Sequence, residues 1–214
     1  MTYLQLINKV LIRLREDTVT DLSASYTLLI GELINEAKRE VENSWNWVQL
    51  RTTIQVPTVA GSLRYTLTGS GNRFKMLYVN NDTDNYELQL ANSKWMTSQI
   101  TLGESSQGQP AYYDLNGTTT AGDFDVDLFP TPDKVYIINY NMIVPQADLV
   151  EITDSLLVSE QPVILRAYAK AISERGEDSG LAYRDAVINA EKSLSDAIAI
   201  DATRVPSELI WETV

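Results

Sequence analysis

The sequence of 214 residues contains no cysteine and no histidine. Without cysteine there is no disulfide, no thiolate nucleophile and no thiol-based redox switch. Without histidine, imidazole zinc sites and Ser-His or Cys-His nucleophile pairs are excluded as well. We therefore expect no catalytic residue, no metal site and no cofactor, and the composition favours a protein that is not an enzyme.

Positive charge and long apolar runs are also scarce. Lysine and arginine number 17 against 29 acidic residues, which gives a net charge of −12. Acids exceed bases in residues 1–50, in 51–147 and most strongly in 148–214. Because DNA binding needs clustered cations to displace counterions from phosphates, we expect no specific nucleic-acid binding. No apolar run approaches the roughly 20 residues that cross a bilayer, so we expect no membrane association.

The strongest pattern in the chain is an amphipathic helix over Leu28–Trp47. Its charged residues fall opposite the apolar side, where Lys38 and Glu42 read as an exposed i,i+4 pair worth about 0.2–0.5 kcal/mol. Trp45 and Trp47 end the segment, and we expect both to anchor by packing the point where the chain leaves the helix. Trp45→Ala is expected to cost about 3–5 kcal/mol of stability. The apolar positions recur three or four residues apart: Leu29, Ile30, Leu33, Ile34, Ala37, Val41 and Trp45.

Helical spacing also occurs at three other places. Thr2 and Gln5 form a T-x-x-Q capping box before a stripe that runs to about Arg15. Pro162 suits the first turn of a later helix, and Gly176 suits the position after its last residue. A fourth helix is predicted from about Asp178 until the pattern ends near Arg204.

The middle of the chain has the period of two that is typical of strands. The segment 94–100 fits a short helix or a turn equally well. We expect the last three strands to form an antiparallel meander. The predicted strands are Leu63–Leu67, Phe74–Val79, Tyr86–Leu90, Tyr112–Leu115, Phe124–Leu128 and Val135–Tyr140.

These patterns predict an α+β fold: an antiparallel helical bundle of two N-terminal and two C-terminal helices, with an inserted small antiparallel β domain. The expected boundaries are 1–50 and 146–204 for the discontinuous helical bundle, 51–145 for the inserted β domain, and 205–214 for a C-terminal docking tail.

Two short motifs resemble parts of known ligand-binding loops. Asp123, Asp125 and Asp127 resemble the start of a calcium loop, but Leu128 stands where that loop needs glycine and Lys134 where it needs glutamate. We favour a strand with a solvated acidic face. Gly69-Ser-Gly71 resembles a phosphate loop, but it leads to a strand-like run and lacks G-K-[ST]. We favour a hairpin turn.

Tyrosines concentrate in the predicted β region. They fit strand packing, since aromatic residues favour strands. They also leave open an alternative function, a carbohydrate- or surface-binding module, which predicts aromatic rings on one exposed face. The residues concerned are Tyr65, Tyr86, Tyr112, Tyr113, Tyr136 and Tyr140.

The C-terminal tail is unusually apolar. Val205, Leu209, Ile210 and Trp211 follow the last predicted helix, where chain ends are normally polar. Left in water they would form an aggregation-prone patch. Either they fold back onto their own helices or they bind a partner, and we take these four as candidate partner-binding residues.

Several segments together resemble the head-to-tail adaptor (connector) proteins of tailed bacteriophages, of the tail tubular A type. The resemblance is carried by Leu33–Val41 with Trp45-x-Trp47, by Gln109–Tyr112, by Leu128–Asp133, by Tyr136-x-Ile138-x-Tyr140 with Pro145, and by Tyr168–Ala171 with Glu174–Glu177.

This resemblance implies a structural virion component at the head-tail junction, made in the host cytoplasm. It implies a homo-oligomeric, dodecameric ring that joins the portal protein to the tail nozzle or tail-completion protein and extends the DNA channel. An acidic lumen would let DNA pass without retaining it. The family shares no catalytic motif, so the resemblance implies no active-site residue.

Overall fold

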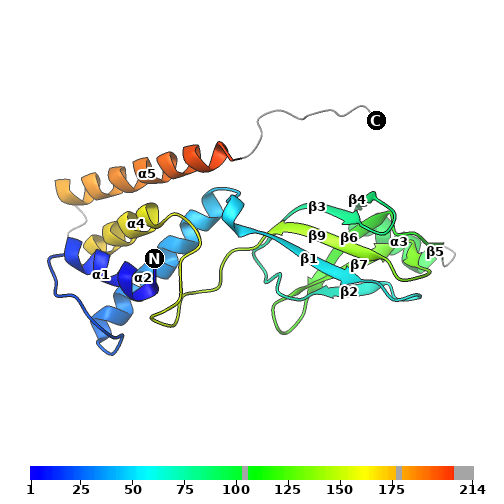
Figure 1. The fold of residues 1–214 in the computed structure, drawn as a ribbon, viewed down its shortest axis with the longest axis horizontal. Helices are drawn as coiled ribbons and strands as arrows, with labels where there is room; N and C mark the ends of the chain where they lie inside the picture. The colour runs from blue at the N-terminus through cyan, green and yellow to red at the C-terminus, as the bar shows by residue number, and fades with distance from the viewer. Residues whose placement is uncertain (103–105, 177–179, 205–214) are drawn as a thin grey trace. The chain divides into compact units, whose positions relative to one another are not determined.

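A computed structural model describes residues 1–102, 106–176 and 180–204 (Figure 1). The described chain divides into two compact units. One consists of Met1–Leu50 with the described residues from Pro145 onward, and the other is Arg51–Val144. The chain therefore leaves the first unit after Leu50 and returns to it at Pro145.

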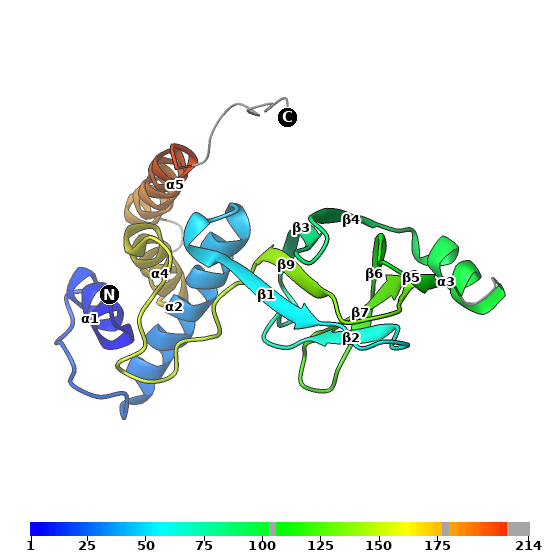
Figure 2. The same ribbon diagram turned by 45° about the vertical axis from the view of Figure 1, so that its right-hand side comes forward.

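The first unit is helical, and the four helices predicted from apolar spacing are confirmed. Thr2 and Gln5 form the predicted capping box at the first of them. One helix, α4, lies between α5 and the pair α1 and α2 (Figures 1 and 2). The elements are α1 (Tyr3–Arg13), α2 (Ser25–Ser44), a short 3-10 helix η1 (Val48–Leu50), α4 (Glu160–Glu174) and α5 (Leu181–Ala202).

A close helix crossing explains the glycine inside α2. A Cβ atom on Gly31 would lie 2.3 Å from the hydroxyl of Tyr3, which belongs to α1. Burial raises the pKa of Tyr3 to about 12, and the nearby carboxylates of Glu32 and Asp148 add to the rise. Tyr3 therefore stays neutral in the contact between the two helices.

The second unit contains a seven-stranded sheet and one further helix, α3 (Ser93–Leu102). The strand order is β1-β9-β3-β4-β6-β7-β2, and the edge strands β1 and β2 approach each other, so the sheet is nearly closed. All its pairings are antiparallel except that of β4 with β6. The strands are β1 (Arg51–Pro57), β2 (Arg64–Leu67), β3 (Lys75–Asn81), β4 (Tyr86–Leu90), β6 (Tyr112–Thr118), β7 (Phe124–Phe129) and β9 (Ile137–Ile143); β5 (Gln107–Gly108) and β8 (Thr131–Pro132) pair separately.

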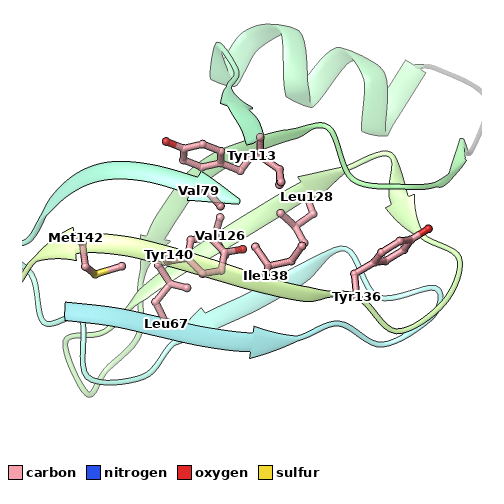
Figure 3. Packing of buried hydrophobic residues seen from close by; sticks show 10 residues of the cluster. Leu67, Val79, Tyr113, Val126, Leu128, Tyr136, Ile138, Tyr140 and Met142 are labelled. Atoms are coloured by element: carbon pink, nitrogen blue, oxygen red, sulfur yellow. The ribbon is translucent and has the colours of Figure 1, made fainter. Parts of the chain in front are cut away.

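The closed curve of the sheet surrounds one apolar core (Figure 3). Alternate residues of each strand point inward, as the period of two requires. The side chains of this core come from six strands and from the loop before β9. They are Leu67, Val79, Leu88, Tyr113, Val126, Leu128, Tyr136, Ile138, Tyr140 and Met142.

The predicted fold class is wrong. The β part is a large, nearly closed mixed sheet with its own helix, and not a small antiparallel insert in a helical bundle. Strand β1 was missed, and it pairs with β9 near the other end of the unit. The expected meander fails because β9 lies between β1 and β3 rather than beside β7. Local patterns show where the strands lie, but these pairings join segments far apart in the sequence. Turn residues do not indicate which distant strands pair.

No helix in the described ranges is long and apolar enough to cross a membrane.

Candidate functional site

Helix α2 holds the segment that returns from the sheet through a row of polar side chains. Asn35, Lys38, Arg39 and Glu42 are spaced three, one and three residues apart, which places them along one side of the helix. We call these four residues the polar row of α2. They bind the segment 146–149, the first residues after the return at Pro145.

The row satisfies the backbone of this extended segment as a neighbouring strand would. The side-chain amide of Asn35 donates to the carbonyl of Leu149 at 3.0 Å and accepts from its N–H at 2.9 Å. Arg39 binds the carboxylate of Asp148 with two nitrogens, and this hydrogen bond raises the pKa of Arg39. Buried backbone groups need such partners, so the row fixes the path of the returning chain.

Lys38 and Glu42 form the buried centre of the row. The Lys38 side chain is 0% exposed, and its Nζ donates to the carbonyls of Gln146 at 2.7 Å and Ala147 at 3.0 Å. It also lies 3.3 Å from Glu42 Oε1, which accepts from the N–H of Gln146 at 3.2 Å. The expectation of an exposed pair is therefore wrong. Helical spacing shows that the two residues are neighbours, but the return segment covers them and comes from about a hundred residues later in the chain.

Asp201, at the end of α5, likewise holds a neighbouring chain segment through hydrogen bonds. Its side chain is buried, and Oδ2 accepts from the indole N–H of Trp45 at 3.2 Å and from the N–H of Val48 at 3.1 Å. Oδ1 accepts from Arg204 at 3.1 Å. Asp201 thus joins the last turn of α5 to the segment that leaves α2 for the sheet.

The two tryptophans of α2 have different roles. Trp47 is 1% exposed and donates its indole N–H to the carbonyl of Val41 at 2.7 Å. Trp45 is only half-buried, and its main polar contact is Asp201. The packing expected of both tryptophans is found at Trp47, whereas Trp45 chiefly supplies a hydrogen bond.

An ion network crosses from α2 over α4 to α5. Lys170 binds Glu36 at 3.0 Å and Glu40 at 2.9 Å, while Arg166 binds Glu40 and lies 2.7 Å from Glu191. Burial opposes ionisation of Glu40, but the hydrogen bonds from Lys170 and Arg166 outweigh it and lower its pKa. The network ties three helices together with partly exposed groups, so each pair contributes little by itself.

The two ligand-like motifs of the β unit bind each other. Asp123 accepts from the backbone N–H groups of Gly69 at 3.0 Å and Gly71 at 3.2 Å. The glycine turn thus uses a carboxylate of its own chain where a phosphate would bind, and both glycines have the positive φ that such a turn needs.

The other two aspartates of the motif are also engaged. Asp125 accepts from Thr66 at 2.6 Å. Asp127 is buried, and Arg64 binds it with two nitrogens at 2.7 and 2.9 Å. The strand predicted here is confirmed, but its acidic face is solvated only in part. Among the described residues, no three potential ligand side chains group as a metal site.

The tyrosines do not gather on one exposed face. Tyr113, Tyr136 and Tyr140 are buried in the sheet core. The hydroxyl of Tyr65 is held by backbone carbonyls in the loop before β2. Tyr112 stacks edge-on against Trp95 of α3, with ring centres 5.0 Å apart, which also settles the segment 94–100 as helix. Strand packing accounts for most of these rings.

The four candidate partner-binding residues Val205, Leu209, Ile210 and Trp211 lie outside the described residues. The residues that organise the end of α5 and the return segment were missed as sites: Asn35, Lys38, Glu42 and Asp201. Their only sequence signal is position. Each of them lies within or beside the apolar stripe of its helix, where a polar side chain needs a buried partner.

A comparison with protein families matches residues 1–207 to the SU10 adaptor protein family. The chain belongs to the SU10 adaptor protein family. This confirms the predicted resemblance to phage head-to-tail adaptors. Membership in this family assigns the protein a structural role as a bacteriophage adaptor and a place among virion components, and it implies that the role is not enzymatic. No curated protein matches the chain.

Proposed function

We propose that this SU10-family protein forms a homo-oligomeric, dodecameric ring at the head-tail junction, where it joins the portal protein to the tail and extends the DNA channel. The observation that carries the proposal is the family match over residues 1–207. The net charge of −12 supports it, because an acidic wall repels DNA phosphates and lets the genome slide past.

We further propose that the two units are separate folding domains with boundaries near residues 50 and 145, followed by a docking tail at 205–214. The sheet unit has its own core, as a domain requires. The polar row and Asp201 hold the chain segments that lead into and out of this unit, so they give the two connections a defined start.

The tail is the proposed contact to the portal or to a neighbouring subunit. Asp201 and Arg204 fix the helix end from which it departs. Its sequence then offers Val205, Leu209, Ile210 and Trp211, and tryptophan is among the residues that most often anchor an interface. A chain that ends at Arg204 should fold with the wild-type melting temperature but fail to assemble on the portal. Normal assembly of that truncated chain would contradict the docking role.

The direct test is electron microscopy of the purified protein, alone and mixed with the portal of its phage. We expect rings that cap one end of the portal. The protein remaining as single subunits under both conditions would overturn the ring and the junction role together.

A further inference from the structure

Helix α5 carries far more apolar surface than the described residues of the chain cover. None of its large apolar side chains is buried, and the residues it does bury are three alanines and Asp201. Leu181 is 78% and Ile188 64% exposed. By contrast, α4 buries Val163, Ile164, Leu165 and Ile172. The large apolar residues of α5 are Leu181, Tyr183, Val187, Ile188, Leu194, Ile198 and Ile200.

These side chains surround the helix rather than forming one stripe. At 100° per residue, Leu181 and Ile188 point almost opposite to the buried Ala190 and Ala197. A helix that is apolar on several sides is normally buried on several sides. The part of the chain that the structure describes covers one side of α5 and leaves the outer side exposed.

The outer side of α5 also carries cations. Arg184 precedes Ile188 by four residues and Lys192 follows it by four, so the three side chains form one row. Asp185 lies at the margin of this row. Among the described residues neither Arg184 nor Lys192 takes part in an ion pair.

A second exposed row lies on the first half of α2. Leu28 is 54% exposed, Leu29 is also exposed, and Glu32 follows Leu28 by four residues. Glu32 forms no ion pair within the described ranges. Helix α4 packs against both α2 and α5, so the two rows lie on helices that a third helix separates (Figures 1 and 2).

We propose that the outer row of α5, Leu181, Arg184, Ile188 and Lys192, binds the row Leu28, Leu29 and Glu32 of α2 in a second copy of this chain. Apolar residues meet apolar residues, and the unpaired cations meet the unpaired acid. The two surfaces differ, so the contact is head-to-tail and can repeat around a closed ring. A symmetric contact of α5 with α5 is the competing arrangement, and crosslinking at Ile188 distinguishes the two. The inference rests on the proposed ring and names the surfaces that build it.

The first test uses Ile188→Glu, followed by mass photometry and electron microscopy with and without portal. Because Ile188 is exposed in the single chain, the variant should keep the wild-type melting temperature. We expect its half-assembly concentration to rise at least about 30-fold, the effect of losing an interface hot spot. Leu90→Glu is the matched control, since Leu90 is equally exposed at 64% but lies on β4. It should assemble like the wild type.

The absence of cysteine permits a cleaner second test by thiol crosslinking. A chain with Leu28→Cys and Ile188→Cys, treated with a short bifunctional thiol reagent, should give a ladder of covalent oligomers. Ile188→Cys alone should give none. A ladder no stronger than that from Leu28→Cys with Leu90→Cys would overturn the proposal, as would efficient dimers from Ile188→Cys alone.

Charge exchange tests the pairing itself. Lys192→Glu and Glu32→Lys should each weaken assembly, and the two together should restore it. Wild-type rings combined with unaffected assembly of Ile188→Glu would overturn this interface but leave the proposed function standing. A wild-type protein that never forms rings, even on the portal, would overturn both.

Discussion

Helices α2 and α5 depart in opposite ways from the rule that apolar residues are buried and charged residues are exposed. Helix α2 buries the charged residues Lys38 and Glu42, whereas α5 leaves Leu181 and Ile188 in solvent. Each departure reflects what lies against the helix. The return segment presents bare backbone groups to α2, which polar side chains satisfy. Among the described elements, α4 makes the most extensive contact with α5, and it covers one side. Burial is therefore set by the partner, and an unsatisfied pattern points to a partner outside the chain.

The largest expected effect is on the α2 side of this comparison. Lys38→Met removes one member of a buried charge pair and the donor to two carbonyls, and it should cost about 3–5 kcal/mol of unfolding free energy in a denaturant titration. Replacing Glu42 by leucine in the same chain should recover part of the loss, because no charge is then left buried. Lys9→Met on the exposed side of α1 is the control and should change stability by less than about 0.5 kcal/mol. A similar small change for Lys38→Met would show that the row is not essential.

The two tryptophans at the end of α2 should separate packing from hydrogen bonding. Trp47→Ala leaves a cavity in a fully covered site and should cost about 3–5 kcal/mol. Because Trp45 is only half-buried, Trp45→Ala mainly removes the donor to Asp201 and should cost about 1–3 kcal/mol, less than the 3–5 kcal/mol expected from the sequence for a packed anchor. Both values come from chemical unfolding under one set of conditions. Equal losses would contradict the distinction drawn from their burial.

Asp201 is the buried polar residue of α5. Its replacement tests whether α5, like α2, is held by buried hydrogen bonds to another chain segment. Asp201→Ala leaves the N–H groups of Trp45 and Val48 without their acceptor, at a cost of about 1–3 kcal/mol. Hydrogen exchange should rise in the last turns of α5 first. Asp196→Ala, an exposed acid on the same helix, should leave the exchange of those amides unchanged. Equal exchange in both variants would assign the attachment of α5 to other residues.

The smallest effect is expected at Glu40, where partly exposed ion pairs join α2 to α4. Its folded pKa lies below the ordinary value of about 4.3 for glutamate. The stabilisation is therefore present above that ordinary value and is lost as the pH falls through the folded pKa. Glu40→Gln should cost under about 1 kcal/mol at neutral pH, and its difference from the wild type should vanish in acid and shrink in high salt. Glu151→Gln, at an exposed position that breaks no ion pair among the described residues, should show neither trend. A difference that persists in acid would exclude this cause.

The candidate sites were predictable only in part. The family resemblance rested on residues such as Asn35, Lys38 and Trp47. The family match confirms it, although the contacts of these residues could not be predicted from the sequence. The strand at the acidic motif was correctly predicted, whereas the hairpin favoured at the glycine turn is wrong, because the two strands that this turn joins, β2 and β3, do not pair with each other. The contact between the two motifs was not predicted, because nothing local links residues more than fifty positions apart.

The sequence by itself determined the places of the four predicted helices, the cap at Thr2, most of the strands and the lack of thiol and imidazole chemistry. These follow from short-range period, turn residues and composition. Only the tertiary structure decided that β1 closes toward β2, that Lys38 is buried and that α5 stays half-covered. The physical reason is the same in each case. Local spacing fixes which side of a helix or strand a residue occupies, but solvation of that side depends on a segment that the chain supplies from far away or from another copy.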